Sequence, residues 1–573
     1  MCGFVGIIET NKEINRTNDM ISMLERIKHR GPDDSKTLIS ETNGVYLGFA
    51  RLSMIDLESS AQPFYKDPQK CIVLFNGEIY NYRELMEEMI NKGASFRTNG
   101  EVETILELYK YYGIDFVHKL DGMFSICIVD IEKGKTYIIR DRIGIKPLYY
   151  SKTGSSFSFF SELKSMPAYI EKKIDKKALK LYFHLRFVPS PFSIFENVKK
   201  VCAGEWICFD NNGNVTHYQY YKHNRKFETR HIDRLKIRNI IQQNIIDTYE
   251  TSDVPIGLFL SGGIDSGIIA ATLNNSVKTI SLNNNEDEIR VTDAIINRYN
   301  LDAERLDPPD KVQDLLKEVI YYLDEPFYSS VSLSTFILSQ SARKYVKGVL
   351  TGDGSDELIF GYKYIKDALD KDDILEAYLS GLGWVKDYKI NDLLLSDDID
   401  KDELYSILFD DCMMDDIFET IRRFEVFKRL PDYHLTRVDR LSMASGLEAR
   451  VPYLRNSYIE YIMGIAPDSI FDPVDSKSLL KNSFSKLLPS ELVNAPKKPF
   501  SAPIRRWIEN DLKNDIERVF NDSVLTDMLE LNSKAINTLL ENYSGKYGDI
   551  SNIWGLYLLL KWTEITFHEK RYA

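Results

Sequence analysis

Chemistry could begin at the second residue of the chain, where Cys2 follows the initiator methionine. Removal of Met1 would leave a thiol and a free α-amino group on one residue. The reference pKa of an α-amino group is about 7.7–8.0 and that of a thiol about 8.5, so the amine can accept the thiol proton near neutral pH. Cys2 is therefore a candidate nucleophile, and the alternative is a small apolar residue that begins a buried strand.

A second group of candidate residues forms the glycine turn SGGIDS at 261–266, which follows an apolar strand and opens a helix. Small residues allow backbone N–H groups at a helix N-terminus to surround a pyrophosphate, and Asp265 could hold Mg²⁺ on the phosphates. The turn is not a Walker P-loop, because the GKT sequence at 134–136 has Val129 where that motif requires glycine. The alternative is an ordinary turn rich in serine and glycine.

Five motifs in the first 150 residues strengthen the interpretation of Cys2. They are MCGFVGI at the start, HRGPDD (29–34), RLSMID (51–56), FNGEIYN (75–81) and RDRIGIKPLYY (140–150). In this order they closely resemble the glutaminase domain of the class II, N-terminal-nucleophile (Ntn) glutamine amidotransferases, and in particular that of the asparagine synthetases.

The resemblance implies a role for each polar residue around the nucleophile. The Asn76 side chain and the Gly77 N–H would stabilise the oxyanion that forms on the glutamine carboxamide. Arg51 would bind the α-carboxylate of glutamine, while Glu78 and Glu101 would bind its α-amino group. The family usually has aspartate in place of Glu101, and the extra methylene moves the carboxylate by about 1.5 Å. This change bears on glutamine affinity rather than on hydrolysis.

Three more stretches support the second group: TGDGSDELIFGY (351–362), RVDRLSMASGLEARVPYL (437–454) and APKKPF (495–500). Their order and spacing resemble the synthetase domain of the asparagine synthetase family, so the resemblance covers most of the chain. It implies that ATP contacts Ser261, Gly262, Gly263, Asp265 and Ser266, and the backbone at Phe259, Leu282, Thr351 and Gly352. It also implies that Asp356 joins Asp265 around Mg²⁺, that Asp353 helps to form or consume an acyl-adenylate, and that Lys497, in preference to Lys498, neutralises it.

Four departures from the family pattern fall where the carboxylate substrate would be recognised. Gly267 replaces the usual serine, the segment 281–288 lacks an expected glycine, 325–334 differs beyond EPF, and Arg455 replaces an aspartate. The change at Arg455 reverses a charge. We therefore expect the glutamine and phosphate chemistry to be kept, while the identity of the acceptor acid stays open.

Short apolar strands and amphipathic helices must position the first group of residues. Strand patterns fall at 4–8, 45–50, 71–75, 124–129, 137–140 and 157–160, and helical spacing falls at 19–28, 82–89 and 102–111. These patterns predict an α+β domain over residues 1–190, for which the resemblance implies the αββα layers of Ntn hydrolases. The NNG turn at 211–213 and the polar stretch KHNRKFETR at 222–230 predict a linker over 191–231.

Residues 232–573 are predicted to form the second domain, an ATP-dependent synthetase. A helical pattern over 232–249, an apolar strand at 257–260 and the SGGIDS turn open an α/β layer. Another strand at 349–350 precedes TGDGSDE, and the chain beyond about residue 360 is mostly helical in pattern. We expect an α/β pyrophosphatase-loop domain with a mostly helical C-terminal part.

The composition of the chain argues against several classes of protein. Asp and Glu number 86 against 73 Lys and Arg, giving a net charge of −13, which argues against nucleic acid as a partner. The six cysteines form no CxxC pair, so neither a disulfide framework nor a zinc site is indicated. No apolar run approaches the ~20 residues of a membrane helix, and no basic segment of a signal peptide is present. We expect a cytoplasmic enzyme of small-molecule substrates, compatible with a homodimer.

The leading hypothesis is a ligase that uses glutamine and ATP, with Mg²⁺, to convert aspartate to asparagine. Ammonia from glutamine would travel inside the protein to a carboxylate activated as its AMP ester, with release of pyrophosphate. The first alternative keeps both chemistries but amidates another carboxylate, such as a sugar acid or a natural-product intermediate. Two others are a glutaminase whose second domain is only a scaffold, and a pyrophosphatase-type enzyme that modifies RNA, which the acidic composition disfavours.

Overall fold

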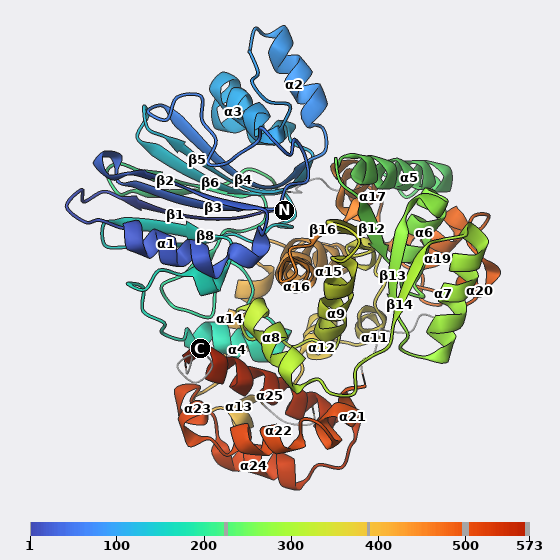
Figure 1. Cartoon of the computed structure of the whole chain (residues 1–573). Coiled ribbons are helices and arrows are strands. Elements are labelled where there is room, and N and C mark those ends of the chain that lie inside the picture. Colours follow the sequence, from blue (N-terminus) through green and yellow to red (C-terminus); the bar gives the residue numbers. More distant parts are fainter. Residues whose placement is uncertain (1, 223–226, 387–389, 496–502, 568–573) are drawn as a thin grey trace.

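The computed structural model of the chain describes residues 2–222, 227–386, 390–495 and 503–567. The N-terminal half is built on two antiparallel sheets, and the C-terminal half is built on one parallel sheet with many helices around it (Figure 1). This order agrees with the prediction of an α+β layered domain followed by an α/β domain whose C-terminal part is mostly helical.

Alternating and continuous apolar residues form the strands of the N-terminal sheets. The first sheet has the order β2-β3-β1-β8-β7-β9 and the second has the order β11-β10-β6-β5-β4. The strands of the first sheet are β1 (Gly3–Glu9), β2 (Asp34–Ser40), β3 (Val45–Arg51), β7 (Tyr149–Thr153), β8 (Ser156–Phe160) and β9 (Lys199–Lys200). Those of the second sheet are β4 (Cys71–Ile79), β5 (Gly122–Asp130), β6 (Lys135–Arg140), β10 (Glu205–Asp210) and β11 (Val215–Gln219).

Helices cover the outer faces of these two sheets. Helix α1 (Thr17–Arg26) packs on β1 and β3, while α3 (Glu101–Tyr112) packs on β4 and against α2 (Tyr82–Asn91). Apolar side chains such as Phe4, Leu47, Ile72 and Phe157 fill the space between the sheets. The result is the αββα layering that the resemblance implies.

The segment 191–231, predicted as a linker, contributes three strands to the sheets. Strand β10 pairs with β6 and β11 pairs with β10, both antiparallel. The NNG sequence at 211–213 is the turn of the β10–β11 hairpin, in which Gly213 has a φ of +82°. The NNG sequence therefore does form a turn, as predicted. However, this turn joins two strands of one sheet and does not connect two domains.

The C-terminal half opens with a parallel sheet of order β14-β13-β12-β15-β16. Its strands are β12 (Ile256–Phe259), β13 (Lys278–Leu282), β14 (Ala303–Leu306), β15 (Gly348–Leu350) and β16 (Glu448–Arg450). Helices α5 (Arg234–Glu250), α6 (Ile264–Leu273), α7 (Glu286–Tyr299), α8 (Gln313–Leu323) and α9 (Ser332–Ala342) surround it. Parallel strands need such crossover helices because both sheet faces must be covered.

Short helices make up most of the remaining chain, with one longer helix, α25, among those that end it (Figure 1). Their bounds are α10 (Ser355–Leu358), α11 (Lys363–Leu369), α12 (Ile374–Leu382), α13 (Ile390–Leu393), α14 (Lys401–Phe409), α15 (Ile417–Phe424), α16 (Thr436–Met443), α17 (Asn456–Met463), α18 (Pro467–Ile470), α19 (Ser478–Phe484), α20 (Ser490–Val493), α21 (Ile504–Glu509), α22 (Lys513–Phe520), α23 (Ser523–Met528), α24 (Ser533–Glu541) and α25 (Tyr547–Phe567). Helix α4 (Lys176–Leu185) belongs to the N-terminal half. Across the described ranges, no helix is both long and apolar enough to cross a membrane.

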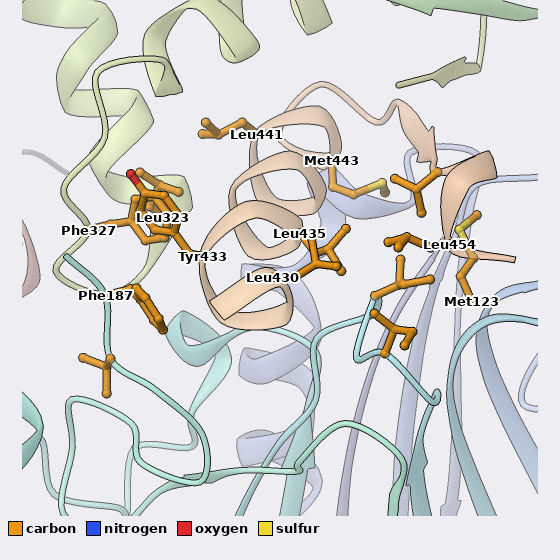
Figure 2. Close-up of a cluster of buried hydrophobic side chains, with 14 of the residues drawn as sticks. Met123, Phe187, Leu323, Phe327, Leu430, Tyr433, Leu435, Leu441, Met443 and Leu454 are labelled. Carbon is orange, nitrogen blue, oxygen red and sulfur yellow. The ribbon is translucent and has the colours of Figure 1, made fainter. Parts of the chain in front are cut away.

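A π-type helix over Glu425–Leu435 joins α15 to α16 without a break and contains Pro431. Proline provides no backbone N–H for the usual helical ladder, and a wider turn accommodates that loss. Figure 2 shows apolar side chains packed on two sides of this helix, with Phe327 and Tyr433 on one side and Leu430 and Leu435 on the other. The rings of Phe327 and Tyr433 are stacked with centroids 5.0 Å apart.

The two halves share a buried interface that contains charged side chains. Arg30 of the N-terminal half contacts Asp439 at 2.8 Å, and Lys164 contacts Asp324 at 2.8 Å. Arg455 contacts Asp121 at 2.6 Å. Buried charges are tolerated only when they are paired, so these contacts fix how the halves meet.

Candidate active sites

The predicted nucleophile lies at the start of β1, beside the predicted oxyanion residue on β4. The backbone nitrogen of Cys2 donates a hydrogen bond of 2.9 Å to Asn76 Oδ1, and its thiol lies 3.7 Å from the Leu52 carbonyl oxygen. Burial raises the pKa of the Cys2 thiol. The resting sulfur is therefore a thiol that needs a base before it can attack.

Gly77 follows Asn76 on β4 in a backbone conformation that favours glycine. Its φ is +152°, and a Cβ atom there would lie 1.9 Å from the Met123 carbonyl oxygen on β5. A side chain would force β4 away from β5, so glycine is required for the strand to hold its place. The backbone N–H of Gly77 is thereby kept beside Asn76, as an oxyanion site needs.

One pocket brings together five of the predicted residues: Cys2, Arg51, Gly77, Glu78 and Glu101 all line it. The Arg51 guanidinium is held at the end of β3, where it donates to the carbonyl oxygens of Asp56 at 2.7 Å and Leu57 at 3.0 Å. A cation at one place and carboxylates at another suit a ligand with both charges, such as an α-amino acid.

Three carboxylates crowd the side of the pocket that Glu101 occupies. Burial raises the pKa of Glu101 to about 8, and the nearby Glu448 carboxylate adds to the rise. Burial also raises the pKa of Glu78, with Glu101 and Glu448 adding to it and Arg450 opposing it. Around Glu448, positive groups including Arg450 and Lys146 outweigh burial and lower its pKa to about 2. Glu101 Oε1 accepts a hydrogen bond of 2.5 Å from Ile79 N.

The predicted pyrophosphate loop connects β12 to α6 and is held by its own serines. Ser261 N donates to Ser266 Oγ at 3.1 Å, and Gly263 N donates to Ser261 Oγ at 3.2 Å. Gly262 lies in the same loop, where a Cβ would come within 3.2 Å of Glu288. The loop geometry is therefore set before any ligand arrives.

The predicted ATP-binding backbone positions end three neighbouring strands. Phe259 ends β12 and Leu282 ends β13, while Thr351 follows β15. These strands are parallel, so their carboxyl ends share one edge, where ligands bind in open α/β sheets. At that edge Gly352 comes so near the first loop that a Cβ would lie 2.8 Å from Asp265 Cβ.

Lys477 joins the two aspartates that were predicted to hold a metal. Its Nζ lies 2.8 Å from Asp265 Oδ1 and 2.7 Å from Asp356 Oδ1. Although burial opposes the charge, the two carboxylates raise the pKa of Lys477. Asp353 lies nearby and pairs with Arg437 at 3.0 Å. One lysine and three carboxylates therefore gather at the sheet edge.

The motifs of the sequence did not single out Lys477. Lys497, to which the resemblance assigns the neutralising role, lies outside the described residues and stays a prediction. Lys477 precedes α19 in the stretch DSKSLLKNSF, which matches none of the motifs quoted above. Only the fold brings it to Asp265, far away in the chain. Arg437 was inside a quoted motif but received no role.

Two of the four departures from the family pattern, Gly267 and Arg455, have a structural explanation. At Gly267 a Cβ would lie 2.4 Å from Leu492 Cδ2, so the helix packs too closely there for a serine without adjustment. Arg455 contacts Asp121 of the N-terminal half and lies over the Tyr80 ring at 4.5 Å. It therefore pairs across the interface between the two halves.

Comparisons with known proteins agree with this arrangement. Residues 1–221 match the family model described as a glutamine amidotransferase domain, and residues 237–564 match the model described as asparagine synthase. Glutamine-hydrolysing asparagine synthetase 1 of Bacillus subtilis is 29% identical, covering 100% of this chain and 98% of its own. Glutamine-hydrolysing asparagine synthetase 2 of Arabidopsis thaliana is 28% identical, covering 92% of this chain and 83% of its own.

Proposed function

Because this chain belongs to the asparagine synthase family and begins with a glutamine amidotransferase domain, it is an enzyme of glutamine-dependent amide synthesis, and we propose that it converts aspartate to asparagine. In sum, glutamine, aspartate, ATP and water would give glutamate, asparagine, AMP and pyrophosphate. The N-terminal pocket would release ammonia, and the edge of the parallel sheet would activate the acceptor.

The first half-reaction uses Cys2 as the nucleophile. Once Met1 is removed, the α-amine of Cys2 accepts the thiol proton, and the thiolate attacks the carboxamide carbon of glutamine. The oxyanion is stabilised by the Asn76 side chain and the Gly77 N–H. The C–N bond then breaks, ammonia leaves with that proton, and water hydrolyses the thioester to glutamate. Arg51 holds the α-carboxylate, and Glu78 with Glu101 hold the α-amino group.

The second half-reaction forms an acyl-adenylate. ATP lies on the loop 261–266 and against the backbone at Phe259, Leu282, Thr351 and Gly352, with its phosphates near Lys477. The aspartate β-carboxylate attacks the α-phosphorus, and pyrophosphate leaves. Lys477 stabilises the negative charge that builds on the phosphates, and so does Lys497, to which the resemblance assigns this role. Ammonia, carried inside the protein, displaces AMP, with Asp353 placed to assist.

The residues present fit a magnesium ion at this edge. Asp265 and Asp356 provide carboxylate oxygens, the donors that Mg²⁺ prefers, and both face the same lysine. Within the described ranges no cluster of three or more metal-ligating side chains occurs, so phosphate oxygens would complete the shell. When bound, Mg²⁺ would supply positive charge to the phosphates of ATP.

The observation that carries the proposal is that one chain holds both Cys2 beside Asn76 and Lys477 between Asp265 and Asp356. Aspartate as the acceptor is supported by the family and by the position of Arg455, whose reversed charge faces the other half. The test is a pyrophosphate-release screen of the purified enzyme with ATP, Mg²⁺ and ammonia. Aspartate should give faster release than glutamate, uronic acids and other small acids. Turnover with one of those acids and none with aspartate would favour the same mechanism on a different acceptor.

A further inference from the structure

Arg450 of the synthetase half reaches the glutamine pocket of the other half. It lies at the end of β16, and its Nη2 is 2.9 Å from Glu78 Oε1 on β4. Both side chains are buried, with 0% of Arg450 and 1% of Glu78 exposed. A carboxylate that lines the pocket of one domain is therefore paired with a cation from the other.

Neighbouring groups fix the Arg450 side chain in this position. Its Nη1 donates to the carbonyl oxygens of Thr248 at 2.9 Å and Thr251 at 2.5 Å at the end of α5, and its Nε donates to Glu448. Because three partners already fix the guanidinium, it loses little further side-chain conformational entropy when it pairs with Glu78. These three hydrogen bonds hold the guanidinium in place, so its Nη2 stays at ion-pair distance from Glu78 although this contact is not itself a hydrogen bond.

One carboxylate oxygen of Glu78 has no hydrogen-bond partner among the described residues. Within the described part of the chain, nothing donates a hydrogen bond to Glu78 Oε2, although this atom is buried. A buried carboxylate oxygen without a donor is costly, and the α-ammonium group of glutamine would satisfy it. Among the described residues, the charged and titratable groups that face Glu78 are Arg450, Glu448, Glu101 and Tyr80.

We propose that Arg450 is a positioning residue of the glutamine site: it holds the Glu78 carboxylate so that the free oxygen Oε2 receives the α-ammonium group of glutamine. The proposal rests on the role of Glu78 given under the proposed function. It makes the glutaminase half dependent on the synthetase half for substrate recognition. Arg450 also accepts a backbone hydrogen bond of 2.9 Å from Thr351 N, so the same residue adjoins the proposed ATP site.

The test compares two substrates that differ only in the group Glu78 would bind. These are glutamine and 4-carbamoylbutanoate, which is glutamine without the α-amino group. The protein variants are Arg450→Gln, Arg450→Lys and, as a matched control, Arg422→Gln. Arg422 is also fully buried in the synthetase half and pairs with Glu419, away from both sites. The readouts are kcat and KM for hydrolysis of each substrate and the rate of synthesis from added ammonia.

In Arg450→Gln we expect KM for glutamine at pH 7 to rise about tenfold or more, the equivalent of one pKa unit at Glu78. The preference for glutamine over 4-carbamoylbutanoate should shrink by the same factor, and the KM defect should lessen as pH rises. Arg450→Lys keeps the charge and should lie between the wild type and Arg450→Gln. Arg422→Gln should keep the substrate preference of the wild type.

An unchanged preference in both Arg450 variants would overturn the proposal, as would an equal loss of ammonia-dependent synthesis, since that indicates a structural role only. If Arg450→Gln does not fold, Arg450→Lys decides the matter through the same preference ratio. Failure of the proposed function looks different, because the wild-type protein itself would then hydrolyse no glutamine.

Discussion

The proposed role of Cys2 as the nucleophile gives the first prediction at the scale of residues. Cys2→Ala should abolish glutamine-dependent synthesis and leave ammonia-dependent synthesis unchanged, because the thiol acts only in releasing ammonia. Asparagine formation should be measured with each nitrogen source. Cys71→Ala is the control, since Cys71 is also buried but is not among the residues that line the pocket. Full glutaminase activity in Cys2→Ala would exclude Cys2 as the nucleophile.

The carboxylates around Glu101 predict how glutamine binding depends on pH. Burial raises the pKa of Glu101 to about 8, so this carboxyl group holds a proton at pH 7 before glutamine binds. The α-ammonium group of glutamine favours the anion, so binding should release a proton, and affinity should rise as the pH increases from about 6.5 to 8. Calorimetry in two buffers of different ionisation enthalpy measures the proton released.

Two variants sharpen this test. Glu101→Gln cannot lose a proton, so its glutamine affinity should be weaker and its pH dependence flatter than in the wild type. Glu101→Asp restores the residue usual in the family and shows whether the longer side chain matters. Glutamine binding by the wild type without proton release between pH 6.5 and 8 would contradict the assigned charge state.

Lys477 gives a prediction for the other site. Lys477→Ala should lower asparagine synthesis by orders of magnitude with either nitrogen source, because two partly buried carboxylates lose their cation and the phosphates lose a positive charge. Glutaminase activity should survive. Lys481→Ala, one turn further along α19 and paired with Asp475, should have little effect. ADP and phosphate as products of the wild type would reject the adenylate mechanism altogether.

The residues of both sites differ in how far sequence could identify them. Asp265, Asp353 and Asp356 lie in compact motifs whose spacing reflects one turn of backbone, so a single sequence is enough to nominate them. Lys477 and Arg450 reach their partners only through the packing of distant segments. No local pattern encodes that packing, which is why the sequence alone did not indicate Lys477; Lys497, which lies in a motif, stays a prediction.

At the scale of elements, the loops after β12 and β15 approach each other at Gly352. Gly352→Ala would place a Cβ within 2.8 Å of Asp265 Cβ, an atom fixed to its own backbone. The loops must separate by several tenths of an ångström, so we expect kcat/KM for ATP to fall at least tenfold. Glutaminase should be unaffected. Gly464→Ala, which has ordinary helical backbone and lies at the end of α17, serves as the control. An unchanged kcat/KM for ATP in Gly352→Ala would contradict this prediction, because it would show that the two loops accommodate the added Cβ without loss of ATP binding.

The strands and helices differ in how well pattern predicts them. The expected strands at 4–8, 45–50 and 124–129 lie within β1, β3 and β5, because continuous apolar runs are needed where two layers bury both faces. β2 was missed because its residues are mostly polar and exposed, and β10 and β11 because polar turns around them are typical of linkers. Their pairing partners lie elsewhere in the chain.

At the scale of the whole molecule, Arg455 should stabilise the interface without choosing the acceptor. Arg455→Asp would set a carboxylate against Asp121 and Asp247, which lie 2.6 Å and 3.7 Å from the guanidinium. We expect the free energy of unfolding to fall by about 2–3 kcal/mol, since a largely buried pair becomes a repulsion. Preference among acceptor acids should stay as in the wild type. Thermal unfolding and the pyrophosphate screen measure the two effects.

A double-mutant cycle with Asp121→Ala isolates the pair. The two substitutions should be far from additive if Arg455 acts through Asp121. A changed acceptor preference in Arg455→Asp would place the residue at the substrate after all.

The ion pairs across the interface also constrain how the sequence can evolve. Arg30 and Asp439, or Asp121 and Arg455, are encoded far apart, yet each is tolerated only in the presence of the other. A substitution at one position is therefore tolerated only with a matching substitution at its partner. We expect the two positions to covary among related sequences. Recombination that exchanges one half with that of a relative should fail where the pairs do not match. Two folds with separate chemistry thus evolve as a single heritable unit.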